Sequence, residues 1–162
     1  MAAATVIHFG DDDCHRVEVL RGAGYEVDEF NSLDRLRLHL VSRKHVDAVI
    51  VSEVEPRCAE QAAELVREHS GAALILFRRP DVTLDDSGFD RVFPSVARPP
   101  HWLFDTAVVV MQSKELRAQS ERLRAESEAA RVGTVRQRHR TASLIRELPS
   151  PWADLDDPDK KE

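Results

Sequence analysis

The sequence is poor in cysteine and lacks any long apolar run. Its two cysteines, Cys14 and Cys58, are too few for a disulfide framework and fit a reducing compartment better. No apolar stretch approaches the roughly 20 residues that a membrane-spanning helix needs. The N-terminus has no basic start and reaches three aspartates too early for a signal peptide. We therefore expect a cytoplasmic protein that makes no membrane contact.

Short catalytic motifs are missing as well. The chain contains no Gly-rich phosphate loop, no nucleophile elbow and no HExxH sequence. Cys14 and His15 stand side by side, but no second Cys/His pair follows at the spacing of a zinc site. We therefore expect no enzyme, no cofactor and no small-molecule substrate.

The charge of the chain changes sign along its length. The 162 residues carry a net charge of -6, made up of -7 over residues 1–113, +4 over 114–147 and -3 over 148–162. A length of this size allows one ordinary domain with an appendage. The contrast predicts a boundary near Ser113, with a domain before it, an extended charged helix over 114–147 and a disordered tail over 148–162.

Apolar, β-branched runs alternate with helical patterns in the first two-thirds of the chain. The expected strands cover residues 4–9, 25–30, 46–51, 72–77 and 89–93. The expected helices cover residues 14–22, 33–43, 56–69 or 59–69, and those after 100. Strands that alternate with helices favour a parallel sheet covered on both faces. The prediction is an α/β fold with a doubly wound, five-stranded parallel sheet. Its first helix is short, and residues 78–88 have room for a turn or two of helix only.

The residues that follow Ser113 are typical of a long helix. Good helix formers dominate, and Leu116, Leu123 and Ala130 recur every seven residues, as in a coiled-coil seam. Gln119 and Glu126 stand where the second apolar row of such a seam is expected, and a glycine interrupts the segment. The pattern therefore fits a coiled coil and a single projecting helix equally well.

With this order of elements, residues 4–113 resemble the receiver domain of bacterial response regulators. The acidic residues Asp11, Asp12 and Asp13 follow the first strand, as in that family. Residues 23–27 match its turn into the second strand. Residues 47–56 match its third strand and the proline that follows, and the pair at residues 98–99 stands where the family has Lys-Pro.

The resemblance implies a phosphorylation site whose working residues are lost. In an active receiver an aspartate at the end of the third strand attacks a phosphoryl group, and Mg²⁺ neutralises the developing charge. Here the acceptor position falls on Ser52, which lacks the carboxylate. The position of a phosphate-binding Thr or Ser falls on Phe77, and the position of the lysine falls on Arg98, which keeps the charge in another shape. The chain is thus similar to a degenerate, or pseudo-, receiver.

Two features leave alternatives open at this degenerate pocket. Glu53 follows Ser52 and would point to the opposite face of the strand unless a bulge intervenes. Asp11 and Asp12 are candidates for a weak metal site, with capping of the next helix as the alternative.

The expectation for function is a phosphorylation-independent, receiver-like module that works by protein–protein contact in a bacterial signalling system. Its last helix would mediate a homodimer or bind a signalling protein. Candidate contact residues are Trp102, Leu103, Leu116 and Leu123, of which Trp102 and Leu103 are also candidates for the core. One alternative is a receiver that still switches with Mg²⁺ and phosphate.

A second alternative is a nucleic-acid contact through the arginines of residues 131–146. No aromatic residue interleaves these arginines and no helix-turn-helix follows them. A solvated or partner-facing helix is therefore the expectation for this segment.

Overall fold

The computed structural model describes residues 4–42, 45–52, 54–81 and 83–147 of the chain. The expected disordered tail over 148–162 lies outside these residues. Contacts within the chain divide it into two compact units, residues 1–118 and 119–162. No helix in the described part of the chain is long and apolar enough to cross a membrane.

The first unit is built on a five-stranded, all-parallel sheet with the strand order β2-β1-β3-β4-β5. The elements in chain order are β1 (Thr5–Gly10), α1 (Arg16–Gly22), β2 (Glu26–Phe30), α2 (Leu33–Val41), β3 (Ala48–Ser52), α3 (Pro56–His69), β4 (Ala73–Arg78), β5 (Arg91–Pro94) and α4 (Pro99–Glu147). This order confirms the predicted doubly wound α/β fold. The first helix is short, as expected, with seven residues.

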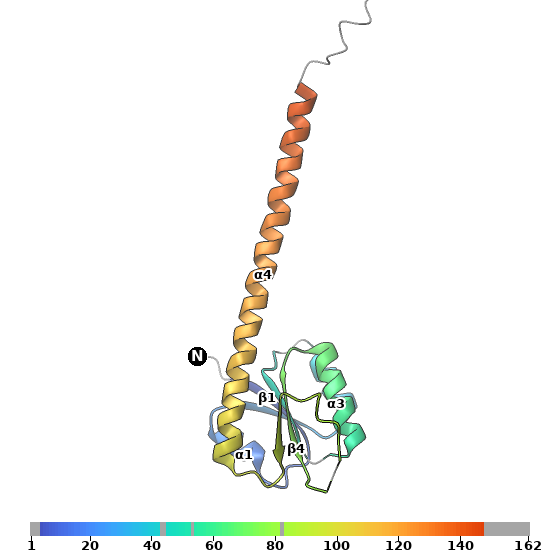
Figure 1. The fold of residues 1–162 in the computed structure, drawn as a ribbon, viewed down its shortest axis with the longest axis vertical. Helices are drawn as coiled ribbons and strands as arrows, with labels where there is room; N and C mark the ends of the chain where they lie inside the picture. Colours follow the sequence, from blue (N-terminus) through green and yellow to red (C-terminus); the bar gives the residue numbers. More distant parts are fainter. Residues whose placement is uncertain (1–3, 43–44, 53, 82, 148–162) are drawn as a thin grey trace, which may run out of the picture. The chain divides into compact units, whose positions relative to one another are not determined.

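Alternate residues of each strand are buried on opposite faces of the sheet, because side chains along a strand alternate in direction. On one face, α2 and α3 cover residues such as Ile7, Val49 and Leu74. On the other face, α1 and the first part of α4 cover Val6 and Ile50. Figure 1 shows α1 and α4 together on one side of the sheet and α3 on the other. The three central strands are buried on both faces, which explains their near-continuous apolar sequence.

The connection between β4 and β5 differs most from the expected pattern. Instead of a short helix, the described residues 79–81 and 83–90 contain only turns and irregular chain. Polar contacts fasten this connection to the domain: the Leu74 amide donates to Asp90 Oδ2 (2.7 Å), and Arg67 Nη2 donates to the Gly88 carbonyl (2.6 Å). Pro80 and the neighbouring aspartates favour turns over helix. The described part of this connection therefore has less helix than the turn or two that the sequence allowed.

The last helix, α4, has 49 residues and is the longest element of the chain (Figure 1). It runs through Ser113 without a break, and its contacts with the domain reach Arg117. Ser113 Oγ donates to the Gly71 carbonyl (3.3 Å), and Arg117 donates to Asp47 Oδ1 (3.1 Å) and to the Val46 carbonyl (2.7 Å). Beyond Arg117, every described side chain of α4 is exposed.

Gly10 ends β1 in a conformation that only glycine tolerates well. Its φ is +108°, in the region that side chains with a Cβ disfavour. A Cβ at this position would overlap the Ser52 carbonyl oxygen and lie 2.5 Å from Val54 Cγ1. The close approach of β1 and the end of β3 therefore depends on this glycine.

We predict that Gly10→Ala lowers the free energy of unfolding by about 3 kcal/mol or more, because the backbone strain at positive φ adds to the steric overlap of the new methyl group. Gly24→Ala is the matched control: its φ is +90°, but nothing lies within 4 Å of the added methyl group. The control should cost about 1 kcal/mol from the backbone alone. Urea unfolding of both variants measures the difference, and equal losses would contradict the role given to the close approach.

Candidate functional site

Four residues stand in register at the carboxyl edge of the sheet. Gly10 pairs with Ser52, Ser52 with Phe77, and Phe77 with Phe93. The sequence predicted Ser52 and Phe77 as two parts of the degenerate phosphorylation pocket, and the strand register places them side by side. Both side chains are fully buried, on the face that α1 and α4 cover.

The side chain of Arg16, the first residue of α1, fills this edge. Arg16 is 1% exposed. Arg16 Nη2 donates to the Ser95 carbonyl (2.6 Å), Nη1 lies 3.5 Å from Ser52 Oγ, and Cζ lies 4.2 Å above the centre of the Phe77 ring. A buried cation needs such partners, since burial removes it from water. The ring face adds a cation–π attraction.

His8 completes the buried polar cluster from β1. Its Nε2 shares a hydrogen bond with Ser52 Oγ (3.1 Å) and lies 3.9 Å from Asp12 Oδ1. His8 is 1% exposed. Because both contacts fall on the same ring nitrogen, the three side chains do not form the relay in which a histidine links a serine to a carboxylate through its two nitrogens.

Of the three acidic residues after β1, Asp12 caps the start of α1. Both oxygens of Asp12 accept backbone hydrogen bonds from the first turn, from the Arg16 amide (2.6 Å) and the Val17 amide (3.2 Å). Such a cap satisfies amides that have no partner within the helix. Asp11 and Asp13 are exposed. In the part of the chain that the structure describes, no group of three His, Cys, Asp or Glu side chains is placed to hold a metal ion.

The remaining pocket residues from the sequence analysis lie elsewhere. Arg98 is exposed, four residues beyond the end of β5, and its carbonyl accepts the His101 amide as α4 begins (3.1 Å). No side-chain hydrogen bond or ion pair joins it to the cluster among the described residues. The positive charge at the carboxyl edge is instead that of Arg16. Glu53 lies outside the described residues.

The four candidate contact residues divide into core and surface. Trp102 is 1% exposed and meets the Phe77 ring edge-on, with the centroids 5.5 Å apart, so it is a core residue rather than a contact residue. Leu103 is half-buried and packs against the same cluster. Leu116 and Leu123 are 64% and 59% exposed. Of the four candidates, only Leu116 and Leu123 have side chains exposed enough to contact a partner.

Three groups of this cluster were not predicted from the sequence: Arg16, His8 and the Ser95 carbonyl. A signal for Arg16 exists, because it shares the buried side of α1 with Val17 and Leu20, where a charge is unusual. His8 likewise interrupts an otherwise apolar strand. Neither pattern alone reveals that the two side chains meet.

No protein-family model matches the sequence, and no curated protein sequence matches it. Solved structures match the fold. An adenylate cyclase from Rhodopirellula baltica aligns with a TM-score of 0.63 at 13% identity, over 76% of this chain and 98% of that one. The signal receiver domain of an HD domain-containing protein from Pseudomonas fluorescens aligns with a TM-score of 0.61 at 15% identity, over 73% and 94%.

A third match is the receiver domain of the sensor histidine kinase PA1611 from Pseudomonas aeruginosa, with magnesium in its active-site cleft. It aligns with a TM-score of 0.56 at 13% identity, over 67% of this chain and 98% of that one. Identities this low establish the fold alone. The first unit of the chain therefore has the receiver fold.

Arg16 should stabilise the fold far more than its exposed neighbour Arg21. We predict that Arg16→Ala lowers the free energy of unfolding by about 2–3 kcal/mol, because it removes a buried hydrogen bond and the contact with Phe77. Arg21→Ala, on the same helix, removes an exposed ion pair with Glu29 (2.7 Å) and should cost less than about 1 kcal/mol. Urea unfolding compares them, and a loss from Arg21→Ala as large as that from Arg16→Ala would refute the prediction.

Proposed function

We propose that the chain is a receiver-like signalling module that acts through protein–protein contacts and does not depend on phosphorylation. The observation that carries this proposal is the buried cluster at the carboxyl edge of the sheet. There the guanidinium of Arg16 lies against Ser52, the residue that the receiver resemblance assigns to the acceptor position.

The chemistry of the cluster argues against phosphoryl transfer. An acceptor needs a carboxylate within reach of the donor, and the metal that assists it needs several oxygen ligands that converge on it. Ser52 is fully buried and is hydrogen-bonded to His8. Asp12 accepts two amides of the first turn of α1, and the described part of the chain holds no group of three His, Cys, Asp or Glu side chains placed to bind a metal ion.

Arg16 also supplies a positive charge at the carboxyl edge of the sheet. The receiver from Pseudomonas aeruginosa holds a magnesium ion in its active-site cleft. A side-chain cation needs neither metal nor phosphate to stay in place. The module would then present one constant surface to its partners, whereas a receiver that switches alternates between two surfaces.

The surface available for such a partner lies on α4. In the family that the sequence resembles, the helix between the fourth and fifth strands and its neighbours pass the signal onward. Here the described residues between β4 and β5 hold no helix. The exposed leucines of α4, Leu116 and Leu123, offer an apolar contact instead. Exposed apolar side chains in a row commonly mark a contact site.

Incubation with acetyl phosphate and Mg²⁺, followed by intact-protein mass measurement, tests the proposal. We predict no phosphoryl adduct on the wild-type chain under conditions that label an active receiver. An adduct would contradict the proposal, and two variants would then locate it. Loss of the adduct in Ser52→Ala would identify the serine as acceptor, and loss in Glu53→Gln would identify the neighbouring carboxylate.

A further inference from the structure

The second half of α4 is a helix without a partner. Every described side chain from Ala118 onward is exposed. Helices in water gain most of their stability from packing an apolar face. Gly133 and the β-branched Val132, Thr134 and Val135 weaken the helical preference in the middle of this segment. The segment therefore needs a surface to pack against.

One stripe along this helix carries no charge at all. Its residues recur at alternating intervals of four and three, the spacing of a coiled-coil seam. We call it the neutral seam; it consists of Leu116, Ser120, Leu123, Ser127, Ala130, Thr134, Gln137, Thr141 and Leu144. Residues 119–147 also contain seven arginines and four glutamates, and every one of them lies off the neutral seam.

The same spacing extends back into the part of α4 that the domain buries. Counting backward from Leu116 by three and four gives Ser113, Val109, Thr106 and Trp102, all of which are buried. The neutral seam is therefore the continuation, in sequence register, of a stripe that already serves as a packing face.

The threonines of the neutral seam can be buried without leaving a hydroxyl donor unpaired. Thr106 is fully buried, and its hydroxyl donates to the carbonyl four residues earlier (2.7 Å). Thr134 and Thr141 make the same bond, each at 2.9 Å, while still exposed. Since the hydroxyl donor is satisfied within the helix, covering these residues leaves no donor unpaired and buries a methyl group.

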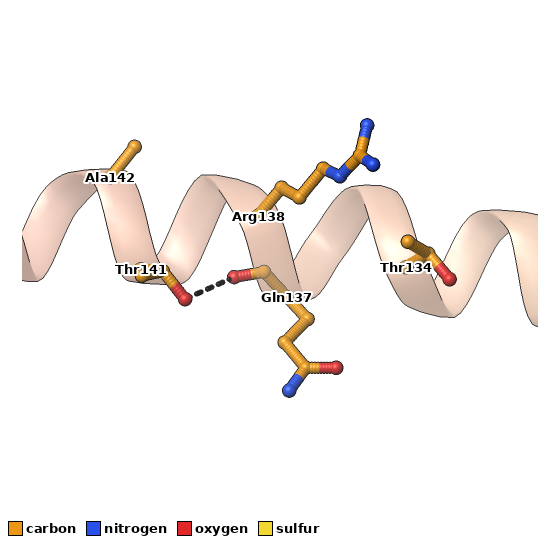
Figure 2. Close-up of a pocket in the computed structure, with 5 residues that line it drawn as sticks. All are labelled: Thr134, Gln137, Arg138, Thr141 and Ala142. Atoms are coloured by element: carbon orange, nitrogen blue, oxygen red, sulfur yellow. Dashed lines mark hydrogen bonds between the residues drawn. The ribbon is translucent and has the colours of Figure 1, made fainter.

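The surface around Thr134 and Thr141 already has a shallow hollow. Thr134, Gln137 and Thr141 follow one line along the helix, with Arg138 and Ala142 beside it, and the five residues line the hollow (Figure 2). In a coiled coil each seam side chain enters a hole formed by four residues of the facing helix. A hollow lined by three seam residues and a flanking arginine fits that arrangement.

The charged rows beside the neutral seam select the partner and its direction. One flank consists of Arg117, Arg124, Arg131 and Arg138, and the other consists of Gln119, Glu126, Gly133 and Arg140. Two parallel copies in register bring one flank against the other, so that Glu126 of one copy faces Arg131 of the second. Antiparallel copies would bring the arginine row against itself, and like charges repel.

We propose that residues 116–144 form a parallel, in-register, two-stranded coiled coil with a second copy of this chain. The inference rests on the proposed contact function and names its partner. One row of the seam carries Leu116, Leu123 and Leu144, and the other carries the β-branched Thr134 and Thr141. Leucine in the first of these rows and β-branched residues in the second favour two strands over three. Because serines and a glutamine share the seam, the dimer should dissociate on dilution.

Light scattering and sedimentation on the full chain test the seam with a matched pair of variants. Ala130→Glu places a carboxylate in the neutral seam, whereas Ala125→Glu adds the same charge on the opposite side of the helix. Wild type and Ala125→Glu should have twice the monomer mass, and Ala130→Glu should dimerise about a hundredfold more weakly or not at all. A monomeric or trimeric wild type, or equal behaviour of the two variants, would overturn the proposal.

Cysteine cross-linking tests the direction. In a chain with Cys14→Ser and Cys58→Ser, either Ser120→Cys or Thr141→Cys alone should give a disulfide-linked dimer on mild oxidation, and Ala125→Cys should not. In an antiparallel dimer, at most one of these two positions can lie beside the same position of the second copy. If either variant gives no disulfide-linked dimer, the parallel arrangement is wrong.

The two proposals fail separately. A monomer that takes up no phosphoryl group would overturn the neutral seam and leave the proposed function standing. A dimer that acetyl phosphate labels would overturn the proposed function and leave the neutral seam standing.

Discussion

The carboxyl edge of the sheet is organised around one buried guanidinium, that of Arg16. Arg16 reaches from the start of α1 to the Ser95 carbonyl after β5 and crosses over Phe77 on the way. The groups that replace the water it loses include the Ser95 carbonyl, the Ser52 hydroxyl and the face of the Phe77 ring. An aspartate at position 52 would bring a carboxylate beside this cation, and the resulting ion pair would compete with metal and phosphate for both groups.

The opposite edge of the sheet depends on a second buried charge, that of Asp47. Its carboxylate accepts the Thr5 amide at the start of β1 (2.9 Å) and the Arg117 guanidinium (3.1 Å). One side chain thus connects β1, β3 and α4, and its 5% exposure keeps these bonds away from competing water. Arg16 closes one edge of the sheet and Asp47 anchors the other, whereas the described side chains of α4 beyond Arg117 are exposed.

Much of this could be predicted from the sequence, because it depends on local periodicity. Strand and helix patterns gave the fold, and the strand registry that brings Ser52 beside Phe77 followed from the receiver resemblance. The place of Arg16 could not be derived, since a charge on a seven-residue helix is buried only when distant partners meet it. For Trp102 the sequence left both core and contact open, because an aromatic residue on an amphipathic helix fits either place. The second row of the coiled-coil seam was expected at Gln119 and Glu126, three residues after Leu116 and Leu123.

Moving that row by one position changes the physical interpretation of the whole helix. Four residues after each leucine come Ser120 and Ser127, which are small and neutral, and Gln119 and Glu126 then become flanking residues. A seam of small polar residues buries less apolar area than a leucine zipper, so its association should be weaker and easier to reverse. It also exposes little apolar surface while unpaired, so that the single chain avoids non-specific aggregation. A contact module that is always in its active form would need this property, because only concentration or competition would then control its assembly.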